Sequence, residues 1–272
     1  MTVRIEKKGK VWTVIHSRPE VKNAMDPASA DALAEALTAF DRDPEASVAV
    51  LWGEGGAFCA GWDLKYGASL VNDPAPLRAL DYPPDDREPA SATEFLRGPM
   101  GPTRLELDKP VIAAVAGPAV AGGFEIALWC DLRVMEESAY FGVYCRRWGV
   151  PLIDGGTVRL PRIVGRGRAL DIILTGRKVE AGEALRINLC EQVVPDGESR
   201  PRAEALAREI ARFPQGCMRA DRRSVYLQQG LPLREAMGEE WRNGAPVLAA
   251  EALEGAKRFT SGKGRHGDFG NI

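Results

Sequence analysis

The chain has 272 residues, of which 45% are hydrophobic and 27% are charged, as is ordinary for a globular protein with one large domain or two small ones. Its 36 basic and 38 acidic residues give a formal net charge of −2, so no global field would attract nucleic acid or an anionic membrane. No apolar run approaches the ~20 residues that span a bilayer. The first residues, MTVRIEKKGK, are too charged for a signal peptide. Five scattered cysteines without a CxxC pair predict reduced thiols, and the cytoplasm is the expected location.

In the first half of the chain, short apolar strands alternate with turns and helices. Residues 3–15 alternate apolar and polar side chains around Lys8-Gly9-Lys10, which predicts a β-hairpin. Residues 27–40 begin with proline and repeat apolar side chains at helical spacing. Residues 48–52 and 111–115 are predicted strands, each leading into a glycine-containing segment. The repeating unit is therefore strand, glycine turn and helix.

The middle of the chain differs from the last third. Residues 72–102 are rich in proline and contain the charged run DDRE, which predicts a loop or an irregular helix. This segment is either a wall of a ligand site or a solvent-exposed insertion. Beyond it, glycine and proline separate five predicted helices, at residues 166–175, 180–187, 202–213, 218–229 and 247–259.

Two glycine-containing segments carry the strongest chemical signal. They are AFCAGWDL at residues 57–64 and AGPAVAGGFEIAL at residues 116–128. In each, glycine lets the backbone bend sharply and come close to a ligand, so that an amide N–H can point at a developing oxyanion. Residues 124–130 have helix-forming composition, which puts the Gly122 amide at a helix N-terminus, where negative charge is favoured. The two segments together predict an oxyanion hole for an activated thioester carbonyl.

With RPEVKNAMD at residues 18–26 and GVPLIDGGTVRLPRIVG at residues 149–165, these segments resemble the enoyl-CoA hydratase/isomerase (crotonase) family. The resemblance covers residues 11–269, except for a dissimilar insert at about 66–102. It implies an α/β fold, a crotonase-like spiral of ββα repeats. Residues 1–200 would form the core with an acyl-CoA site, and residues 201–272 a helical region for trimerisation and pocket cover. It further implies a homotrimer or a dimer of trimers, an acyl-CoA thioester as substrate, and no cofactor besides the coenzyme A of that substrate.

The resemblance assigns the binding of the thioester oxygen to two backbone amides and a proton-transfer role to one glutamate. The amides are those of Trp62 and Gly122, and the Trp62 indole would pack either under the ligand or in the core. Glu125 matches one of the two catalytic carboxylates of the family. A buried glutamate in an apolar helix has a raised pKa, which suits a general acid or base. The alternative is a surface glutamate or a structural salt bridge.

The second catalytic carboxylate of family hydratases is replaced by Cys145, counted from the Phe141-Gly142 pair. A thiol, with an ordinary pKa of about 8.5, is a poor group for positioning and deprotonating water. Cys145 could instead be a nucleophile, although no histidine is near it in sequence to activate it. Asp154 could compensate as the acid or base, one position later than the resemblance predicts, or it could cap the helix that begins near Gly155.

For coenzyme A, the resemblance indicates backbone groups around residue 24 and residues 62–65, with basic side chains near the phosphates. The two histidines, His16 and His266, are at opposite ends of the chain, so neither a zinc site nor a Ser-His-Asp triad is expected. The coenzyme A candidates are Lys22, Ala24, Ala60, Asp63, Leu64, Lys65 and Lys263, with Arg265 as an alternative to Lys263.

Three functions remain open from the sequence. Hydration of 2-enoyl-CoA, a hydro-lyase reaction of fatty acid metabolism, is the first expectation because it is the commonest activity of the family. Isomerisation of Δ3- to Δ2-enoyl-CoA needs one group that takes and returns a proton, so it tolerates Cys145 better than hydration does. A low-turnover acyl-CoA-binding protein would keep the oxyanion hole only to grip its ligand.

Overall fold

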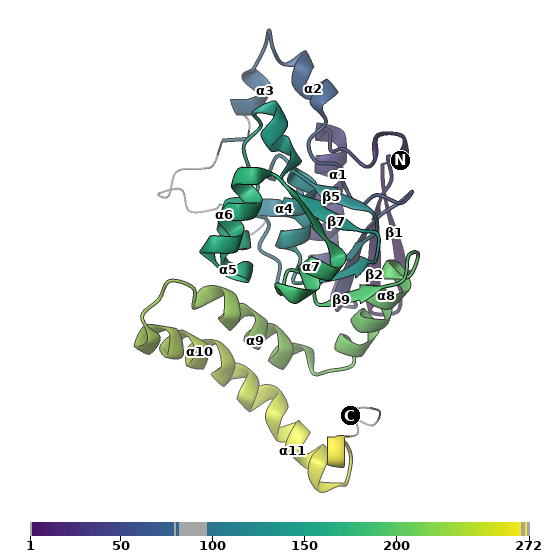
Figure 1. Ribbon diagram of the computed structural model, residues 1–272. Helices are drawn as coiled ribbons and strands as arrows, with labels where there is room; N and C mark the ends of the chain where they lie inside the picture. The colour runs from purple at the N-terminus through teal and green to yellow at the C-terminus, as the bar shows by residue number, and fades with distance from the viewer. Residues whose placement is uncertain (1, 79, 82–96, 268–269, 271–272) are drawn as a thin grey trace. The chain divides into compact units, whose positions relative to one another are not determined.

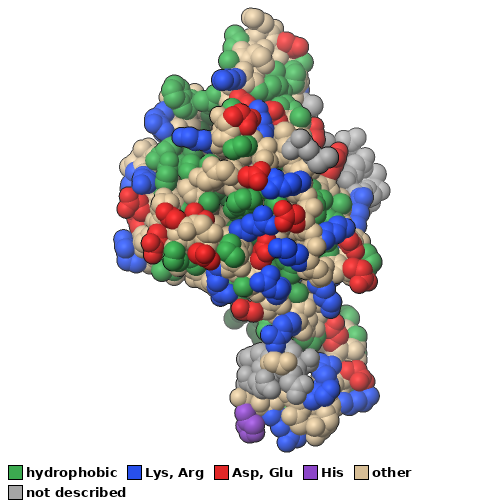
Figure 2. All heavy atoms as spheres, turned by 90° about the vertical axis from the view of Figure 1, so that its right-hand side faces the viewer, with side chains coloured by type: hydrophobic (Ala, Val, Ile, Leu, Met, Phe, Trp, Pro, Cys, Tyr) green, Lys and Arg blue, Asp and Glu red, His purple; other side chains and the backbone are tan. Residues whose placement is uncertain are grey.

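The computed structural model describes residues 2–78, 80–81, 97–267 and 270 (Figure 1). The chain divides into two compact units, Met1–Ala207 and Arg208–Ile272. Within the predicted insert at about 66–102, residues 79 and 82–96 lie outside the described residues. No helix in the described part is long and apolar enough to cross a membrane. On the face drawn in Figure 2, basic and acidic side chains are interspersed, without a large area of one sign.

A six-stranded sheet is the main sheet of the first unit. In order across the sheet, its strands are β1 (Val3–Lys8), β2 (Val11–His16), β3 (Val48–Gly53), β4 (Val111–Val115), β6 (Leu132–Glu136) and β9 (Gln192–Val194). β1 and β2 form the predicted antiparallel hairpin, and all other neighbours are parallel. β2 and β4 are buried along their whole length and β3 along most of it. Parallel strands covered on both faces are continuous apolar runs, which is why β3 and β4 were predictable.

A smaller sheet in the same unit holds β5 (Pro118–Val120), β7 (Tyr140–Gly142) and β8 (Lys178–Glu180). β5 and β7 are parallel, whereas β7 and β8 are antiparallel. β8 and β9 lie in the last third, which was predicted to be mostly helical. Strands of three residues are too short to show a period of two, so they could not be predicted from alternation of apolar and polar residues.

The helices of the first unit follow the strands in the predicted alternation (Figure 1). α1 shows why one of them forms: the Asp26 carboxylate caps its first turn by accepting the Ser29 N–H at 2.8 Å. At its other end, the buried Lys109 ammonium donates to the carbonyls of Phe40 and Asp43, where a cation is favoured. The helices are α1 (Pro27–Arg42), α2 (Leu64–Ser69), α3 (Ala75–Arg78), α4 (Gly122–Trp129), α5 (Gly156–Val164), α6 (Arg166–Thr175), α7 (Ala181–Arg186) and α8 (Ser199–Ile210), with 3-10 turns at Pro19–Val21, Pro102–Arg104 and Tyr144–Trp148.

The second unit is helical in its described residues. α9 (Gln215–Leu227) packs against α10 (Leu233–Val247), which continues through a π turn (Leu248–Ala252) into α11 (Leu253–Thr260). A further 3-10 turn spans Arg265–Gly267. The prediction of a helix at 218–229 is confirmed, but α10 was missed. Its sequence contains Gly238, Gly244 and Pro246, which weaken intrinsic helix propensity, and packing against α9 overrides that weakness.

Three loops leave the main sheet at one edge. Because β2, β3 and β4 are parallel, the segments 17–26, 54–63 and 116–121 all begin at the carboxyl ends of their strands, where ligands bind in open α/β sheets. Backbone hydrogen bonds join these segments: Met25 N donates to Gly61 O at 2.7 Å, and Val120 N donates to Cys59 O at 3.0 Å. The segments singled out by the sequence therefore meet in space.

Candidate active site

The backbone N–H groups of Trp62 and Gly122 lie in the joined loops and donate no hydrogen bond to the described residues. The bonds from Met25 N to Gly61 O and from Asp63 N to Met25 O form a parallel bridge between Met25 and Trp62. This pattern leaves the Trp62 N–H unpaired. Gly122 is the first residue of α4, where N–H groups have no partner within the helix. Among the described residues, neither of these two N–H groups donates a hydrogen bond, so both are available to a ligand.

Close packing holds the two segments together. A Cβ atom at Gly61 would lie 3.1 Å from Gly122 N, and one at Gly123 would lie 2.1 Å from the carbonyl oxygen of Cys59. Glycine is required at both positions because a side chain would push the segments apart. Ala121, which precedes Gly122, has φ 54° and ψ −126°, a conformation that residues with a side chain rarely adopt.

Glu125 lies in the first turn of α4 and is only 2% exposed. Its Oε1 accepts hydrogen bonds from Asp154 N at 2.9 Å and from Gly156 N at 2.8 Å. In the described part of the chain, no group donates to Oε2. Burial, and next the negative charge of Asp154, raise the pKa of Glu125 to about 7. A carboxyl group with a pKa near neutrality can both accept and release a proton. The alternative of a surface position does not describe this buried residue.

The Asp154 side chain is buried and turns toward a different loop. Its Oδ1 accepts hydrogen bonds from Met100 N at 3.0 Å and from the Thr103 hydroxyl, and burial raises its pKa. The alternative prediction that Asp154 caps the following helix is wrong. The cap of α5 is Gly155, without a side-chain hydrogen bond, because the Asp154 carboxylate is engaged by the 98–103 segment. A proton-transfer role for Asp154 stays a prediction.

Cys145 lies in the 3-10 turn after β7 and is 6% exposed. It is a free thiol, as are the other four cysteines. Burial, and next the charge of Glu125, raise the pKa of Cys145. The thiol is therefore protonated at neutral pH and close enough to Glu125 to feel its charge. A raised pKa is the opposite of what an activated cysteine nucleophile needs.

The coenzyme A candidates near residue 24 and near residue 62 lie on two joined loops. Ala60 N donates to Lys22 O at 2.9 Å. The Asp63 carboxylate caps α2 by accepting the Lys65 N–H at 2.9 Å. Ala24 and Ala60 are half-buried, whereas Lys22, Leu64 and Lys65 are exposed. Lys263 belongs to the second unit, where it is exposed in the turn after α11.

Arg18 joins the two loops that hold the coenzyme A candidates, a contact that sequence reasoning missed. Its guanidinium donates to Ala24 O at 2.5 Å and lies 3.2 Å from carboxylate oxygens of both Asp26 and Asp63. Arginine suits this place because its planar fork reaches several acceptors at once. Arg18 stands in the RPEVKNAMD motif, but nothing in the motif says which distant carboxylate it binds.

A cavity of about 390 Å³ lies beside the Trp62 indole. The rings of Trp62 and Tyr66 meet edge to face, with centroids 6.0 Å apart. The half-buried indole thus lines a cavity and also packs against the hydrophobic core. The lining is apolar apart from one guanidinium and consists of Pro27, Trp62, Tyr66, Pro76, Leu80, Arg97 and Pro99.

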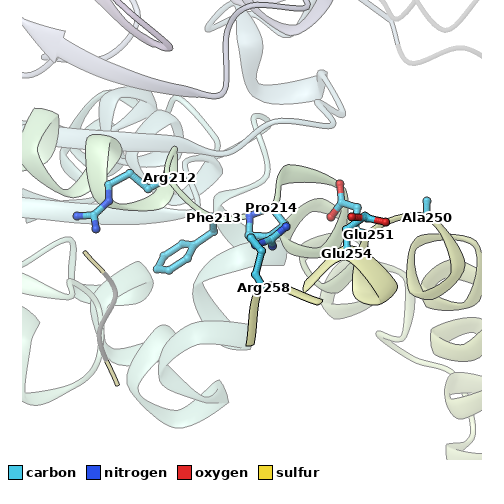
Figure 3. Close-up of a pocket in the computed structure, with 7 residues that line it drawn as sticks. All are labelled: Arg212, Phe213, Pro214, Ala250, Glu251, Glu254 and Arg258. Carbon is cyan, nitrogen blue, oxygen red and sulfur yellow. The ribbon is translucent and has the colours of Figure 1, made fainter. Parts of the chain in front are cut away.

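A second cavity, of about 370 Å³, lies within the second unit (Figure 3). The Glu251 carboxylate in its lining accepts the N–H groups of Gly216 and Cys217, each at 2.9 Å, and so caps the first turn of α9. Glu254 pairs with the Lys257 ammonium at 2.5 Å. These acids are engaged in holding the helices, so we place no part of the catalytic site there. The lining residues are Arg212, Phe213, Pro214, Ala250, Glu251, Glu254 and Arg258.

Comparisons with known proteins agree over nearly the whole chain. A family model described as enoyl-CoA hydratase/isomerase matches residues 6–78 and 103–259, and the unmatched stretch between them falls within the predicted insert. The enoyl-CoA hydratase EchA19 of Mycobacterium tuberculosis is 35% identical over 94% of this chain and 92% of that protein. The (E)-benzylidenesuccinyl-CoA hydratase of Thauera aromatica is 33% identical over 87% of each chain.

Solved structures give the same result for the fold. A crystal structure of an enoyl-CoA hydratase from Mycobacterium tuberculosis matches with a TM-score of 0.83 and 31% identity, covering 96% of both chains. One from Bacillus anthracis has a TM-score of 0.82 at 28% identity, again over 96% of both. The α/β crotonase-like fold predicted from the motifs is confirmed. The chain belongs to the enoyl-CoA hydratase/isomerase family.

Proposed function

We propose that this protein is an enoyl-CoA hydratase, a hydro-lyase that adds water across the C2=C3 double bond of a 2-enoyl-CoA thioester. One observation carries the proposal: two unpaired backbone N–H groups, at Trp62 and Gly122, lie in joined segments, and α4 carries the buried Glu125 one turn beyond Gly122. Similarity to hydratases over most of the chain supports it. Coenzyme A enters with the substrate, and the reaction needs no other cofactor.

The two amides bind the thioester oxygen. When water adds to C3, negative charge passes through C2 and the carbonyl carbon to that oxygen, and an enolate forms. The N–H groups of Trp62 and Gly122 donate to the charged oxygen more strongly than to the neutral carbonyl, so they lower the barrier. Loss of one such donor typically costs ~10²–10³ in rate.

Glu125 carries out both proton transfers in this scheme, and the same proton moves in each. Its carboxylate takes a proton from water as the water oxygen bonds to C3, and it then gives that proton to C2, which consumes the enolate and restores the carboxylate. Oε1 is held by the N–H groups of Asp154 and Gly156, so Oε2 is the oxygen that exchanges the proton. A pKa of about 7 balances both steps near neutral pH.

Isomerisation is the second candidate, and Cys145 is the observation that favours it. An isomerase would use Glu125 to take a proton from C2 of a 3-enoyl-CoA and return it to C4, with the same amides holding the enolate oxygen. No second carboxylate is needed, and the protonated Cys145 thiol, whose pKa is raised, can remain a bystander.

Product analysis distinguishes the candidates. The protein is incubated with short- and long-chain 2-enoyl-CoA and 3-enoyl-CoA, and products are identified by mass and chromatography. A gain of one water that disappears in Glu125→Gln supports hydration, whereas a double-bond shift without mass change supports isomerisation. Glu35→Gln, an exposed position on α1, is the matched control. Retained acyl-CoA binding without any product would contradict both and leave an acyl-CoA-binding protein.

Cys145→Glu tests what the site is built for. The substitution restores the second carboxylate expected of family hydratases. Higher hydratase activity in this variant would mean that the natural site is not built primarily for adding water, and it would favour isomerisation. Lower hydratase activity would mean that the thiol belongs to a working hydratase.

We further propose a homotrimer or a dimer of trimers formed through the second unit. Leu233, Met237 and Trp241 recur every four residues along α10, so they share one face, and they are 78%, 62% and 67% exposed. An apolar stripe of this kind is typical of a surface covered by another subunit. Light scattering of Trp241→Glu should give a smaller assembly than the natural protein. The free thiols support a cytoplasmic location.

A further inference from the structure

We propose that Asp154 is a positioning residue that ties the 98–103 segment to the loop holding Glu125, and that it is not a second proton-transfer group. This inference rests on the proposed function, since it assigns how Glu125 is held for that reaction. It is carried by a buried set of hydrogen bonds around Asp154, Thr103 and Arg159.

The side chain of Asp154 makes the first tie. It is 4% exposed, and its Oδ1 accepts both the Met100 N–H and the Thr103 hydroxyl. Gly98 is also part of this packing, because a Cβ there would lie 2.5 Å from Asp154 Oδ1 and 2.1 Å from the Thr103 hydroxyl oxygen. The three residues of the 98–103 segment therefore fit closely around one carboxylate oxygen.

Arg159 makes the second tie between the same two segments. From α5, its guanidinium donates to Asp154 O at 2.9 Å and to Thr103 O at 2.8 Å. The guanidinium thus links the main chains of Asp154 and Thr103, whose side chains are already hydrogen-bonded to each other. Two independent links fix their separation, and a rigid planar donor is suited to this.

The main chain of Asp154 connects these hydrogen bonds to Glu125. The Asp154 N–H is one of the two donors to Glu125 Oε1, and the Gly156 N–H is the other. If the carboxylate of Asp154 lost its partners, the loop that presents both donors would shift. Misplacement of a reacting group by about 1 Å can cost ~10²-fold in rate.

The 98–103 segment also connects Asp154 to the proposed oxyanion hole. Met100, whose N–H Asp154 binds, packs directly on Gly122, since a Cβ at Gly122 would lie 2.4 Å from Met100 Sδ. The Asp154 carboxylate therefore holds in place both the N–H donors to Glu125 and the Met100 side chain that packs on Gly122.

The described contacts of the Asp154 carboxylate are those of a structural tie. It is turned toward the 98–103 segment, where its Oδ1 accepts two donors. Its negative charge instead acts on Glu125 through space, together with Arg159 and the thiol of Cys145, the other ionisable groups near that carboxyl. Removing the Asp154 charge should lower the pKa of Glu125, because a like charge disfavours the ionised form.

Substitutions that separate shape from charge test the proposal. Asp154→Asn keeps an oxygen that can accept the Met100 and Thr103 donors but removes the charge, so kcat should fall by less than about 10-fold, and the limb of the pH–rate profile set by Glu125 should move to lower pH. Asp154→Ala removes the carboxylate that accepts both donors, and Thr103→Val removes the hydroxyl donor, so in each variant kcat should fall by ~10² with KM nearly unchanged. Thr103→Ser keeps the hydroxyl and should restore the rate.

Two outcomes overturn the inference. One is a loss in Asp154→Asn as large as that in Glu125→Gln, ~10²–10⁴, which would make Asp154 a proton-transfer group. The other is a natural rate in Thr103→Val. If Asp154→Ala does not fold, the comparison of Thr103→Val with Thr103→Ser still decides. Failure of the proposed function looks different, because the unsubstituted protein would then give no product from either enoyl-CoA.

Discussion

Gly123→Ala should separate the two segments that carry the predicted oxyanion donors. A Cβ at this position would lie 2.1 Å from Cys59 O and 2.8 Å from both the carbonyl carbon and the Cβ of Cys59, whereas ordinary contact begins at 3.4 Å. The neighbour is backbone, so it cannot rotate away. The segments must therefore move apart by roughly 1 Å.

Gly123→Ala should lower both the stability of the fold and the rate of catalysis. Overpacking of this kind destabilises by about 1–3 kcal/mol, and a domain of this size loses roughly 2–4 °C of Tm for each kcal/mol. A shift of roughly 1 Å between the Trp62 and Gly122 amides should lower kcat by ~10². KM should change less, because the amides bind the charged enolate more strongly than the substrate carbonyl.

The assay follows the loss of absorbance of the conjugated enoyl thioester, with thermal unfolding of the same samples. Gly167→Ala is the matched control, because Gly167 lies in α6 with no atom within 4 Å of its added Cβ. The control should keep its kcat and gain about 0.5–1 kcal/mol. If Gly123→Ala matched the natural protein in both Tm and kcat, the argument from close approach would be refuted.

Three further predictions concern charge. Glu125→Gln should be more stable than the natural protein at alkaline pH. Burial raises the pKa of Glu125 to about 7, so the natural protein loses stability as pH rises from about 4.5 through 7. In urea unfolding, the variant should gain on the order of 1–3 kcal/mol in free energy of unfolding at pH 8, but not at pH 4. Burial lowers the pKa of His16 to about 4, so stability is lost as pH falls from about 6.5 toward 4; His16→Leu should flatten that decline, and an equally steep acid transition would contradict this. Arg18→Met should raise the KM for acyl-CoA by ~10-fold with little change in kcat. Arg42→Met, at an exposed position, is the control and should leave KM unchanged. If Arg18→Met had the KM of the natural protein, Arg18 would not be needed to link the two loops that hold the coenzyme A candidates.

Much of the fold was predictable because its signals are local. The hairpin of β1 and β2, helix α1 and helix α6 each show their period within a single stretch of sequence. α10 and the three-residue strands β8 and β9 were missed. Their structure depends on packing and pairing with distant segments, which local propensity does not report.

The candidate site shows the same contrast between local motifs and contacts over long sequence distances. Trp62, Gly122 and Glu125 were predicted as site residues because each stands at a fixed place in a motif. The partners of Asp154 could not be predicted, because its carboxylate accepts the N–H of Met100, 54 residues earlier in the chain. Arg18 likewise binds Asp63 across 45 residues. Contacts of this range need the folded structure.

The backbone of Ala121 fixes the orientation of the peptide that carries the proposed oxyanion donor. Its unusual conformation costs on the order of 1–3 kcal/mol, and the surrounding hydrogen bonds, including the one from Ala121 N to Gly142 O, hold it in place. Under the proposed function, the Gly122 N–H is oriented before the thioester binds, so no reorganisation is needed when charge develops. Folding would then supply the free energy that this strained residue costs. A laboratory search for thermostable variants should therefore find stabilising changes here that slow the enzyme.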